Sequence, residues 1–242
     1  MAVSQDGSVV ALSAGKKVVV VERGNAAWTQ WRVRLNLTSP DAVYNSAILS
    51  DDASIVALAA NDNQGVIIYT YSPATGIYVR ACAIPPLGGL TVGKLAFSGG
   101  SAPLLVVTHN DIVSSNKWAV VAFAASAWAA PCSAPLPLWT YRSAASSKEY
   151  SDFISSIAVT PDGDYVAIGS WGDKENVNPQ LHVFRGHGGD GKPVLSHVSA
   201  GSVTYVGLLA QASALTVLAV GMQHHENVGV MAGTVFAVSV PV

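Results

Sequence analysis

The chain has 242 residues, of which half are hydrophobic and 12% are charged, and its formal net charge is −2. This length and composition allow one large all-β domain with an extensive core. Because no basic block occurs, the composition argues against nucleic acid as a partner.

No segment has the pattern of a membrane span or a targeting signal. The most apolar window, residues 206–221, is interrupted by Gln211 and Ser213 and is too short to cross a bilayer. We interpret it as two strands joined by a turn. The first ten residues lack a basic region followed by an apolar core, so they are not a signal peptide.

Turns that separate two apolar runs recur along the whole chain. They fall at Asp6-Gly7, Asp51-Asp52, Gly99-Gly100, Asp162-Gly163 and, in degenerate form, Ala212-Ser213. Successive turns are 45, 48, 63 and about 50 residues apart. Short strands at a period of roughly 40–50 residues are typical of propeller blades with four strands each.

The first unit contains the end of an inner strand and three further strands, over residues 8–16, 17–23 and 28–37. In the last of these, Trp31, Val33 and Leu35 alternate with Arg32 and Arg34. This period of two predicts a half-exposed strand at the outer edge of a sheet. The inner runs are continuously apolar, as expected of strands covered on both faces.

The second and third units repeat this order. The second gives strands at residues 43–50, 54–62, 65–72 and 77–84, and the third gives them at 92–98, 103–111, 118–125 and 138–143. A Pro/Ala/Ser-rich insertion, Ser126–Pro137, lengthens the third unit and is expected to be a surface loop. The Ala-rich stretch Ala119–Ala130 is the best candidate for a helix, but we expect a strand followed by a loop.

The fourth unit is the most regular one. Strands at Ile154–Thr160 and Tyr165–Ser170 flank the turn Pro161–Gly163, and Leu181–Arg185 and residues 193–199 complete the unit. The fifth unit gives strands at residues 203–210, 215–222 and 234–240 and no fourth strand. We therefore predict one domain, 1–242, with blades at about 1–40, 41–86, 87–143, 150–200 and 201–242.

These units resemble β-propeller repeats of the WD40/YVTN and PQQ-like (quinoprotein-like) groups. The likeness is strongest over Leu138–Gly186, where LWTYRS leads into SSIAVTPDGDYVAIGS and LHVF. No unit ends in Trp-Asp, and only His197 lies where WD40 repeats often carry a structural histidine. The Gly-rich, Trp-anchored motif of quinoprotein dehydrogenases is absent, so the resemblance implies a fold and no cofactor.

Five blades can form a closed ring, but an open strand edge is an aggregation liability and closure normally joins the first and last strands in one blade. The chain begins with part of an inner strand and ends without an outer one. We favour a segment of a larger propeller, or an incomplete gene model, over a closed five-bladed ring with imperfect closure.

Polar residues gather in the predicted loops between second and third strands, which emerge on one face of a propeller. Function on such folds is located in loops of this kind. The candidate residues of this ligand face are Asp62, His109, Asp111, Trp171, Asp173, Glu175, His224, His225 and Glu226.

Two kinds of chemistry are considered for this face. His109, Asp111 and the run His224–Glu226 are residue types that bind a metal ion, although adjacent histidines usually point apart. Asp62, Asp111, Asp173 and Glu175 are carboxylates of the kind that hydrolyse glycosides. Trp171 is able to stack on a sugar or a peptide, or to anchor the packing of a blade. No GxSxG, P-loop or dinucleotide motif occurs, and we assign no metal, catalytic or cofactor residue.

Other conspicuous residues have structural interpretations. The Asp6-Gly7 and Asp162-Gly163 turns are explained by an Asp that bonds to nearby backbone and a Gly that accepts positive φ. Cys82 and Cys132 are expected to be free or buried thiols, with a disulfide between them as the alternative. The sequon Asn36-Leu37-Thr38, on a predicted exposed strand, favours a secretory setting, but the compartment is left open.

The sequence therefore predicts an all-β propeller that acts as a non-catalytic binding or scaffold module. Its loop-rich face would bind a protein or another ligand. The alternatives are a hydrolase or lactonase that uses acids and histidines on the same face, and a degenerate propeller fragment.

Overall fold

The computed structural model describes residues 1–25, 27, 29–60, 64–100, 103–111, 117–128, 135–143, 153–171, 178–199, 201–211, 214–223 and 232–241. The strands form five antiparallel sheets, four with four strands and one with three, and every sheet is built from consecutive strands. This agrees with the predicted all-β class and with the predicted order of units.

The strands of each sheet run from an inner to an outer edge. The first sheet contains β1 (Ala2–Val3), β2 (Val9–Ala14), β3 (Lys17–Arg23) and β4 (Trp31–Thr38). The second contains β5 (Tyr44–Leu49), β6 (Ile55–Ala60), β7 (Gly65–Ser72) and β8 (Ile77–Ile84). The third contains β9 (Thr91–Phe97), β10 (Leu105–Asn110), β11 (Trp118–Phe123) and β12 (Trp139–Arg142).

The last two sheets follow the same order. The fourth contains β13 (Ile154–Val159), β14 (Tyr165–Ser170), β15 (Leu181–Arg185) and β16 (Pro193–His197). The fifth contains β17 (Ser202–Gln211), β18 (Ala214–Gln223) and β19 (Ala232–Pro241). One short 3-10 helix, η1 (Ala125–Trp128), follows β11.

The sheets stack face to face along an arc, and a hydrophobic core fills each of the four spaces between neighbours. The inner strands β5, β9, β13 and β17 follow one another along this arc. Every residue of β6, β10, β11 and β14 is buried. The continuous Val/Ile/Ala runs of these strands are explained by their position, because a neighbouring sheet covers each face.

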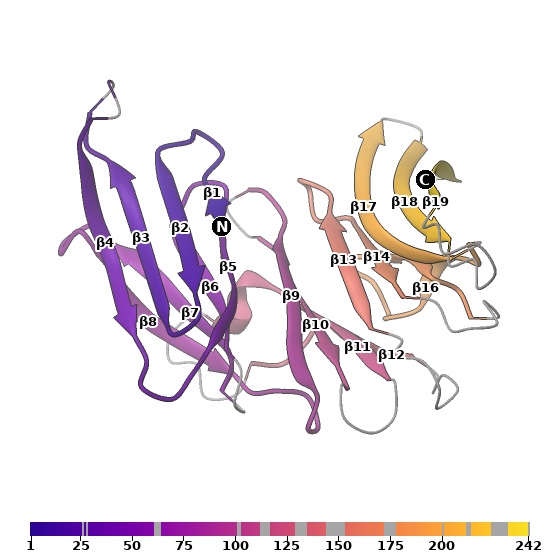
Figure 1. The fold of residues 1–242 in the computed structure, drawn as a ribbon, viewed down its shortest axis with the longest axis horizontal. Helices are drawn as coiled ribbons and strands as arrows, with labels where there is room; N and C mark the ends of the chain where they lie inside the picture. The colour runs from indigo at the N-terminus through magenta and orange to yellow at the C-terminus, as the bar shows by residue number, and fades with distance from the viewer. Residues whose placement is uncertain are drawn as a thin grey trace.

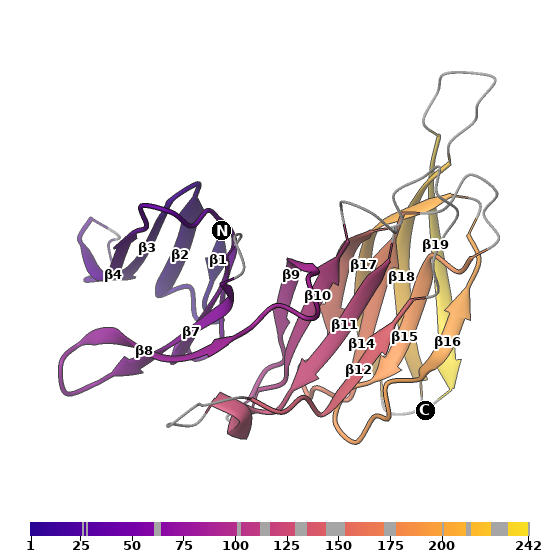
Figure 2. The same ribbon diagram turned by 90° about the horizontal axis from the view of Figure 1, so that it is seen from below.

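The first and last sheets lie at opposite ends of the arc and leave it open (Figure 1). Figure 2 shows the same separation from below. Among the described residues no sheet covers the outward face of either terminal sheet, and large apolar side chains are exposed there. They include Val3, Leu12 and Val33 on the first sheet and Tyr205, Leu209, Leu218 and Val235 on the fifth. Among the described residues the structure is an arc of five sheets rather than a closed ring.

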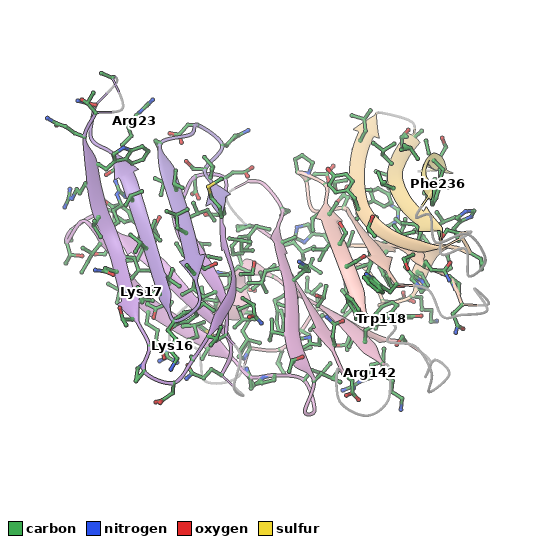
Figure 3. All side chains as sticks on the ribbon, in the orientation of Figure 1. Lys16, Lys17, Arg23, Trp118, Arg142 and Phe236 are labelled. Carbon is green, nitrogen blue, oxygen red and sulfur yellow. The ribbon has the colours of Figure 1, made fainter. Side chains whose placement is uncertain are left out.

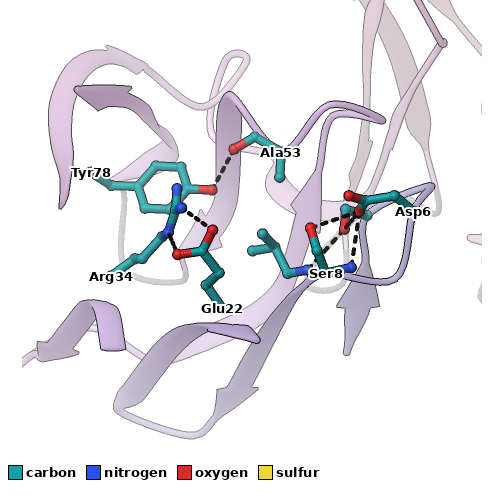
Figure 4. Close-up of polar contacts among 8 residues, drawn as sticks. Asp6, Ser8, Glu22, Arg34, Ala53 and Tyr78 are labelled. Carbon is teal, nitrogen blue, oxygen red and sulfur yellow. Dashed lines mark hydrogen bonds and ion pairs between the residues drawn. The ribbon is translucent and has the colours of Figure 1, made fainter. Parts of the chain in front are cut away.

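The turns between first and second strands repeat one hydrogen-bonded arrangement. Asp6 Oδ1 accepts from Ser4 Oγ at 2.7 Å, Ser8 N at 2.9 Å and Ser8 Oγ at 2.8 Å (Figure 4). Asp52 has the same three partners in Ser50 and Ser54. Thr160 Oγ1 and Asp164 N donate to Asp162 Oδ1.

The backbone of these turns confirms their structural interpretation. Gly7 and Gly163 have φ of 70° and 77°, and Ala53 takes the equivalent position with φ of 54°. The turns of neighbouring sheets also touch, since Gln5 N donates to Asp51 O at 3.0 Å. A Cβ on Gly99 would lie 2.6 Å from Asp51 Oδ2 and 2.9 Å from Pro161 O. The turns between first and second strands thus share one local structure, and the turns of neighbouring sheets contact one another.

A half-buried polar group lies between the first two sheets, where the sequence predicted a regular amphipathic strand. Arg34 forms an ion pair with Glu22 and its guanidinium lies 4.0 Å from the ring centroid of Tyr71. The hydroxyl of Tyr78 donates to Ala53 O at 2.5 Å (Figure 4). Burial raises the pKa of Tyr78 to about 12.

The alternation predicted for β4 does not hold along the strand. Trp31 and Val33 are exposed, whereas Leu35 is buried. A β-bulge changes the register, so that Val20 pairs with Leu35 while Val21 pairs with Val33. Arg34 is the extra residue of the bulge, so the alternation of side chains shifts by one position there. The side chain of Arg34 lies between the two sheets.

The structure also corrects two smaller predictions. Cys82 is disulfide-bonded, so the expected free thiol is wrong at this residue; the other cysteine, Cys132, lies outside the described residues. The insertion is not wholly superficial, because Trp128 is buried against Phe97 with ring centroids 6.2 Å apart. No helix among the described residues is long and apolar enough to cross a membrane.

Candidate functional site

Two of the predicted polar loops begin where β10 and β14 end, and a hydrogen bond between the third and fourth sheets lies at the end of β10. Three predicted site residues are described there: His109, Asp111 and Trp171. The others lie outside the described residues: Asp62, Asp173, Glu175, His224, His225 and Glu226.

His109 is buried in the third sheet, with 1% of its surface exposed. It pairs with Val92 on one side and Ala119 on the other, and Ala119 pairs with Arg142. Val92 belongs to the core between the second and third sheets. Residues paired directly across strands share a face, so the ring of His109 points toward the second sheet.

Burial and charge keep the imidazole of His109 neutral. Burial, and secondarily the positive charge of Arg142, lower the pKa of His109 to about 4. Neither ring nitrogen has a hydrogen-bond partner among the described residues. A buried polar group without a partner is costly, and such groups are uncommon in folded proteins. Arg142 and Trp118 lie at the same end of the third sheet (Figure 3).

Asn110, the next residue, joins the third sheet to the fourth. Its Oδ1 accepts from Ile154 N at 3.0 Å, and its backbone oxygen accepts from Thr91 Oγ1 at 2.9 Å. Its Nδ2 would lie 2.6 Å from a Cβ on Gly93, so this side chain needs a glycine beside it. Asn110 therefore links the end of β10 to the start of β13, and the first residue of β13 pairs with Ser170 at the end of β14.

Asp111 closes the base of the loop that follows β10. Its backbone N donates to Lys117 O at 2.8 Å, directly before β11 begins. Its side chain is partly exposed. Asp111 is thus fixed by a strand end on either side of its loop.

Trp171 follows β14 in the fourth sheet, as Asp111 follows β10 in the third. Its backbone N donates to Phe153 O at 3.0 Å, and its ring stacks on Phe153 with centroids 4.7 Å apart and an interplanar angle of 26°. Phe153 directly precedes Ile154, which donates to Asn110. Trp171 and Phe153 therefore lie next to the Asn110–Ile154 hydrogen bond, and Asp111 follows Asn110 in the chain. The ring of His109 lies on the other side of the third sheet.

The described part of this junction does not have the geometry of a catalytic or metal centre. No group of three or more His, Cys, Asp or Glu residues that could hold a metal ion occurs within the described ranges. A general base needs a hydrogen bond, or one bridging water, to the group it deprotonates. The ring of His109 has no such contact in the described chain.

A second histidine, His182, illustrates the structural use of this residue type. Its ring is 3.0 Å from both Ser196 Oγ and Pro179 O, and it packs edge-to-face on Trp118. Burial lowers the pKa of His182 to about 4 as well. His182 differs from His109 because both of its nitrogens are hydrogen-bonded.

Comparisons with known proteins separate fold from family. No family model matches the chain, and no curated protein matches its sequence. Among solved structures, the chain is similar to the Dos1 propeller, with a TM-score of 0.60 and 12% identity over 89% of this chain and 51% of that one.

The fold is that of a β-propeller. The chain spans about half the length of the Dos1 propeller chain (51%). It also aligns with Sqt1 of Saccharomyces cerevisiae, at a TM-score of 0.49 and 13% identity over 97% of this chain and 72% of Sqt1. At sequence identities this low, structural similarity shows the fold alone. The assignment to the WD40/YVTN or PQQ-like group therefore stays a prediction. The five sheets are called blades from here on.

Proposed function

We propose that this propeller is a non-catalytic binding module. In this proposal its ligand is a segment of another protein that docks at the junction of the third and fourth blades, defined here by Asp111, Phe153 and Trp171. The stacked pair of Trp171 and Phe153 carries the proposal, because it lies where a predicted polar loop begins.

The residue types at this junction suit protein recognition. Trp and Tyr are enriched among the residues that dominate binding energies at interfaces, where a rigid ring supplies a large contact area. Trp171 is held by its own backbone hydrogen bond and by Phe153. Asn110 fixes the neighbouring strand end. A ligand would meet a preorganised surface, which lowers the entropic cost of binding.

A hydrolase on the same face receives no specific support from the described residues. His109 points into the core between the second and third blades, and its ring nitrogens have no hydrogen-bond partner in the described part of the chain. The acids and histidines predicted for this chemistry lie mostly outside the described residues. The enzyme hypothesis remains a prediction that the following experiment also tests.

The experiment compares partners recovered by the wild-type chain and by the double variant Asp111→Ala/Trp171→Ala. Asp190→Ala is the matched control, since Asp190 is an exposed acid near the turns of the opposite face. Truncation of an anchoring Trp costs about 2 kcal/mol or more, so we expect a loss of about 30-fold or more in affinity for a purified partner. The control should bind like the wild type.

Thermal melting of each variant checks that the fold is retained. Recovery of the same partners by the double variant would contradict the proposed face. An ester, lactone or glycoside activity of the wild type that the double variant loses would instead support the hydrolase hypothesis.

A further inference from the structure

One motif of the sequence plays no part in the proposed binding module. Asn36-Leu37-Thr38 is the only Asn-X-Ser/Thr triplet in the 242 residues. Such a triplet is the acceptor for N-linked glycosylation in secreted proteins, provided that its middle residue is not proline. Because short triplets also occur by chance, a functional site needs two further features. The asparagine must be accessible in the folded chain, and the chain must mature in a compartment where the transfer takes place.

The triplet lies at the end of β4, the outer strand of the first blade, and its two polar residues share a face. Residues i and i+2 of a strand point to the same side of the sheet, whereas the residue between them points to the other side. Leu37 packs against the core between the first two blades. Asn36 and Thr38 therefore point away from this core, and both are exposed.

This exposure is a property of outer strands and does not depend on whether another blade lies beside the first. In the third and fourth blades, which have a neighbour on both sides, Thr140 and Ser196 lie on the corresponding face of the outer strand. Thr140 pairs with Val121, which belongs to the core toward the second blade. Ser196 pairs with His182, whose ring packs on the third blade. Both Thr140 and Ser196 are exposed, so a side chain placed like Asn36 stays accessible even where two blades flank the sheet.

An independent observation concerns the compartment. Cys82 lies in the core between the second and third blades, with 3% of its surface exposed, and it is disulfide-bonded. Disulfides form and persist in oxidising compartments such as the lumen of the endoplasmic reticulum, and they are rare in the cytosol. Since Asn-X-Ser/Thr triplets are glycosylated in secreted proteins, the disulfide and the triplet point to the same compartment.

We propose that Asn36 is a site of N-linked glycosylation. The sugar donor is an oligosaccharide linked to a lipid diphosphate. Asn36 Nδ2 forms a bond to C1 of the first sugar, the bond between C1 and the diphosphate oxygen breaks, and Nδ2 loses one proton as the lipid diphosphate leaves. The attached sugar is bulky and hydrophilic, and β4 lies far along the arc from the third and fourth blades (Figure 1). The site is therefore compatible with the proposed binding face and independent of it.

Mass spectrometry of the chain, purified without reductant from the cells that produce it, tests the proposal. We expect the peptide that contains Asn36 to carry a sugar that peptide-N-glycosidase removes, with conversion of Asn36 to Asp. In the same cells, Asn36→Gln and Thr38→Ala should each lose the sugar, because one removes the acceptor asparagine and the other removes the hydroxyl. Thr38→Ser is the matched control, and it should keep the sugar because it retains the hydroxyl.

Thermal melting of the variants checks that each is folded. All three substitutions are at exposed positions, where changes usually have small effects on stability. Two results would each overturn the proposal. The first is an unmodified Asn36 in the folded chain, whether Cys82 is oxidised or reduced. The second is a sugar that Asn36→Gln or Thr38→Ala retains, since it would then be attached elsewhere.

Discussion

The third and fifth blades both have strongly apolar inner strands, but their surroundings differ. In the third blade, every residue of β10 and β11 is buried between two neighbouring blades. In the fifth blade, β18 has an equally apolar sequence, yet Leu215 and Val217 are buried while Leu218 is 44% exposed. The comparison shows that burial in this protein depends on the number of neighbouring blades rather than on the apolar content of a strand.

A matched pair of leucine truncations should give the largest effect and sharpen this comparison. Leu105 in β10 is fully buried, whereas Leu209 in β17 is 58% exposed. Leu105→Ala should lower the free energy of unfolding by about 2–5 kcal/mol, because it leaves a cavity in the core. Leu209→Ala should change it by about 0.5 kcal/mol or less. Urea denaturation of both variants measures the difference, and equal losses would contradict the uncovered face of the fifth blade.

The disulfide at Cys82 is expected to have the next largest effect, on an inner blade. Reduction should lower the free energy of unfolding by about 2–4 kcal/mol, because the bond restricts the unfolded chain. Denaturation with and without dithiothreitol measures this loss. Cys82→Ser is the control and should show no further response to the reductant. Detection of two free thiols per native chain, which has two cysteines, would refute the bond.

Exchange of the left-handed turn residues tests whether terminal and inner blades share the same local structure. Gly7 in the first blade and Ala53 in the second both have positive φ. Gly7→Ala should destabilise the protein by about 1 kcal/mol, because a Cβ is strained in this conformation. Ala53→Gly should relieve the same strain, partly offset by the greater entropy of the unfolded chain. Thermal melting should move in opposite directions, and shifts of the same sign would contradict equivalent turns.

The smallest expected effect is the titration of Asp6. Hydrogen bonds from Ser8 N, Ser4 Oγ and Ser8 Oγ lower the pKa of Asp6 from 3.8 to about 2. A lowered pKa in the folded state means that this carboxylate stabilises the fold above about pH 4, and that its contribution is lost as the pH falls toward 2. Carboxyl NMR titration should give a midpoint near 2. Ser8→Ala should move it upward, and an unchanged midpoint would contradict the assigned cause.

Much of the fold could be predicted because propeller strands carry strong local signals. The Asp-Gly turns at Gly7 and Gly163 need positive φ, and Asp6 and Asp162 accept hydrogen bonds within a few residues. The bulge opposite Val20 and Val21 could not be predicted from β4 alone. It depends on pairing with another strand, and it exposes Trp31 and Val33, for which the alternation predicted an inward position.

The candidate ligand face stays a prediction. Asp111 and Trp171 were chosen as polar or aromatic loop residues, and they follow β10 and β14, strands of two blades that the Asn110–Ile154 hydrogen bond links. Phe153 was missed, since an aromatic residue before a strand looks like any core residue in sequence. The Asn110–Ile154 hydrogen bond, which joins the two blades across 44 positions, leaves no local pattern. Gly93 is a related feature of the sequence, because a Cβ at this position would lie 2.6 Å from Asn110 Nδ2.

The sequence by itself determined the strands, their order and the turns, because each depends on residues close together in the chain. Only the tertiary structure decided which faces of the sheets are buried and which are exposed. Leu105 and Leu209 lie in equally apolar strands, yet a neighbouring blade covers one and not the other. Neighbours are set by packing between distant segments, and the free energy of burial depends on that packing rather than on the residue type alone.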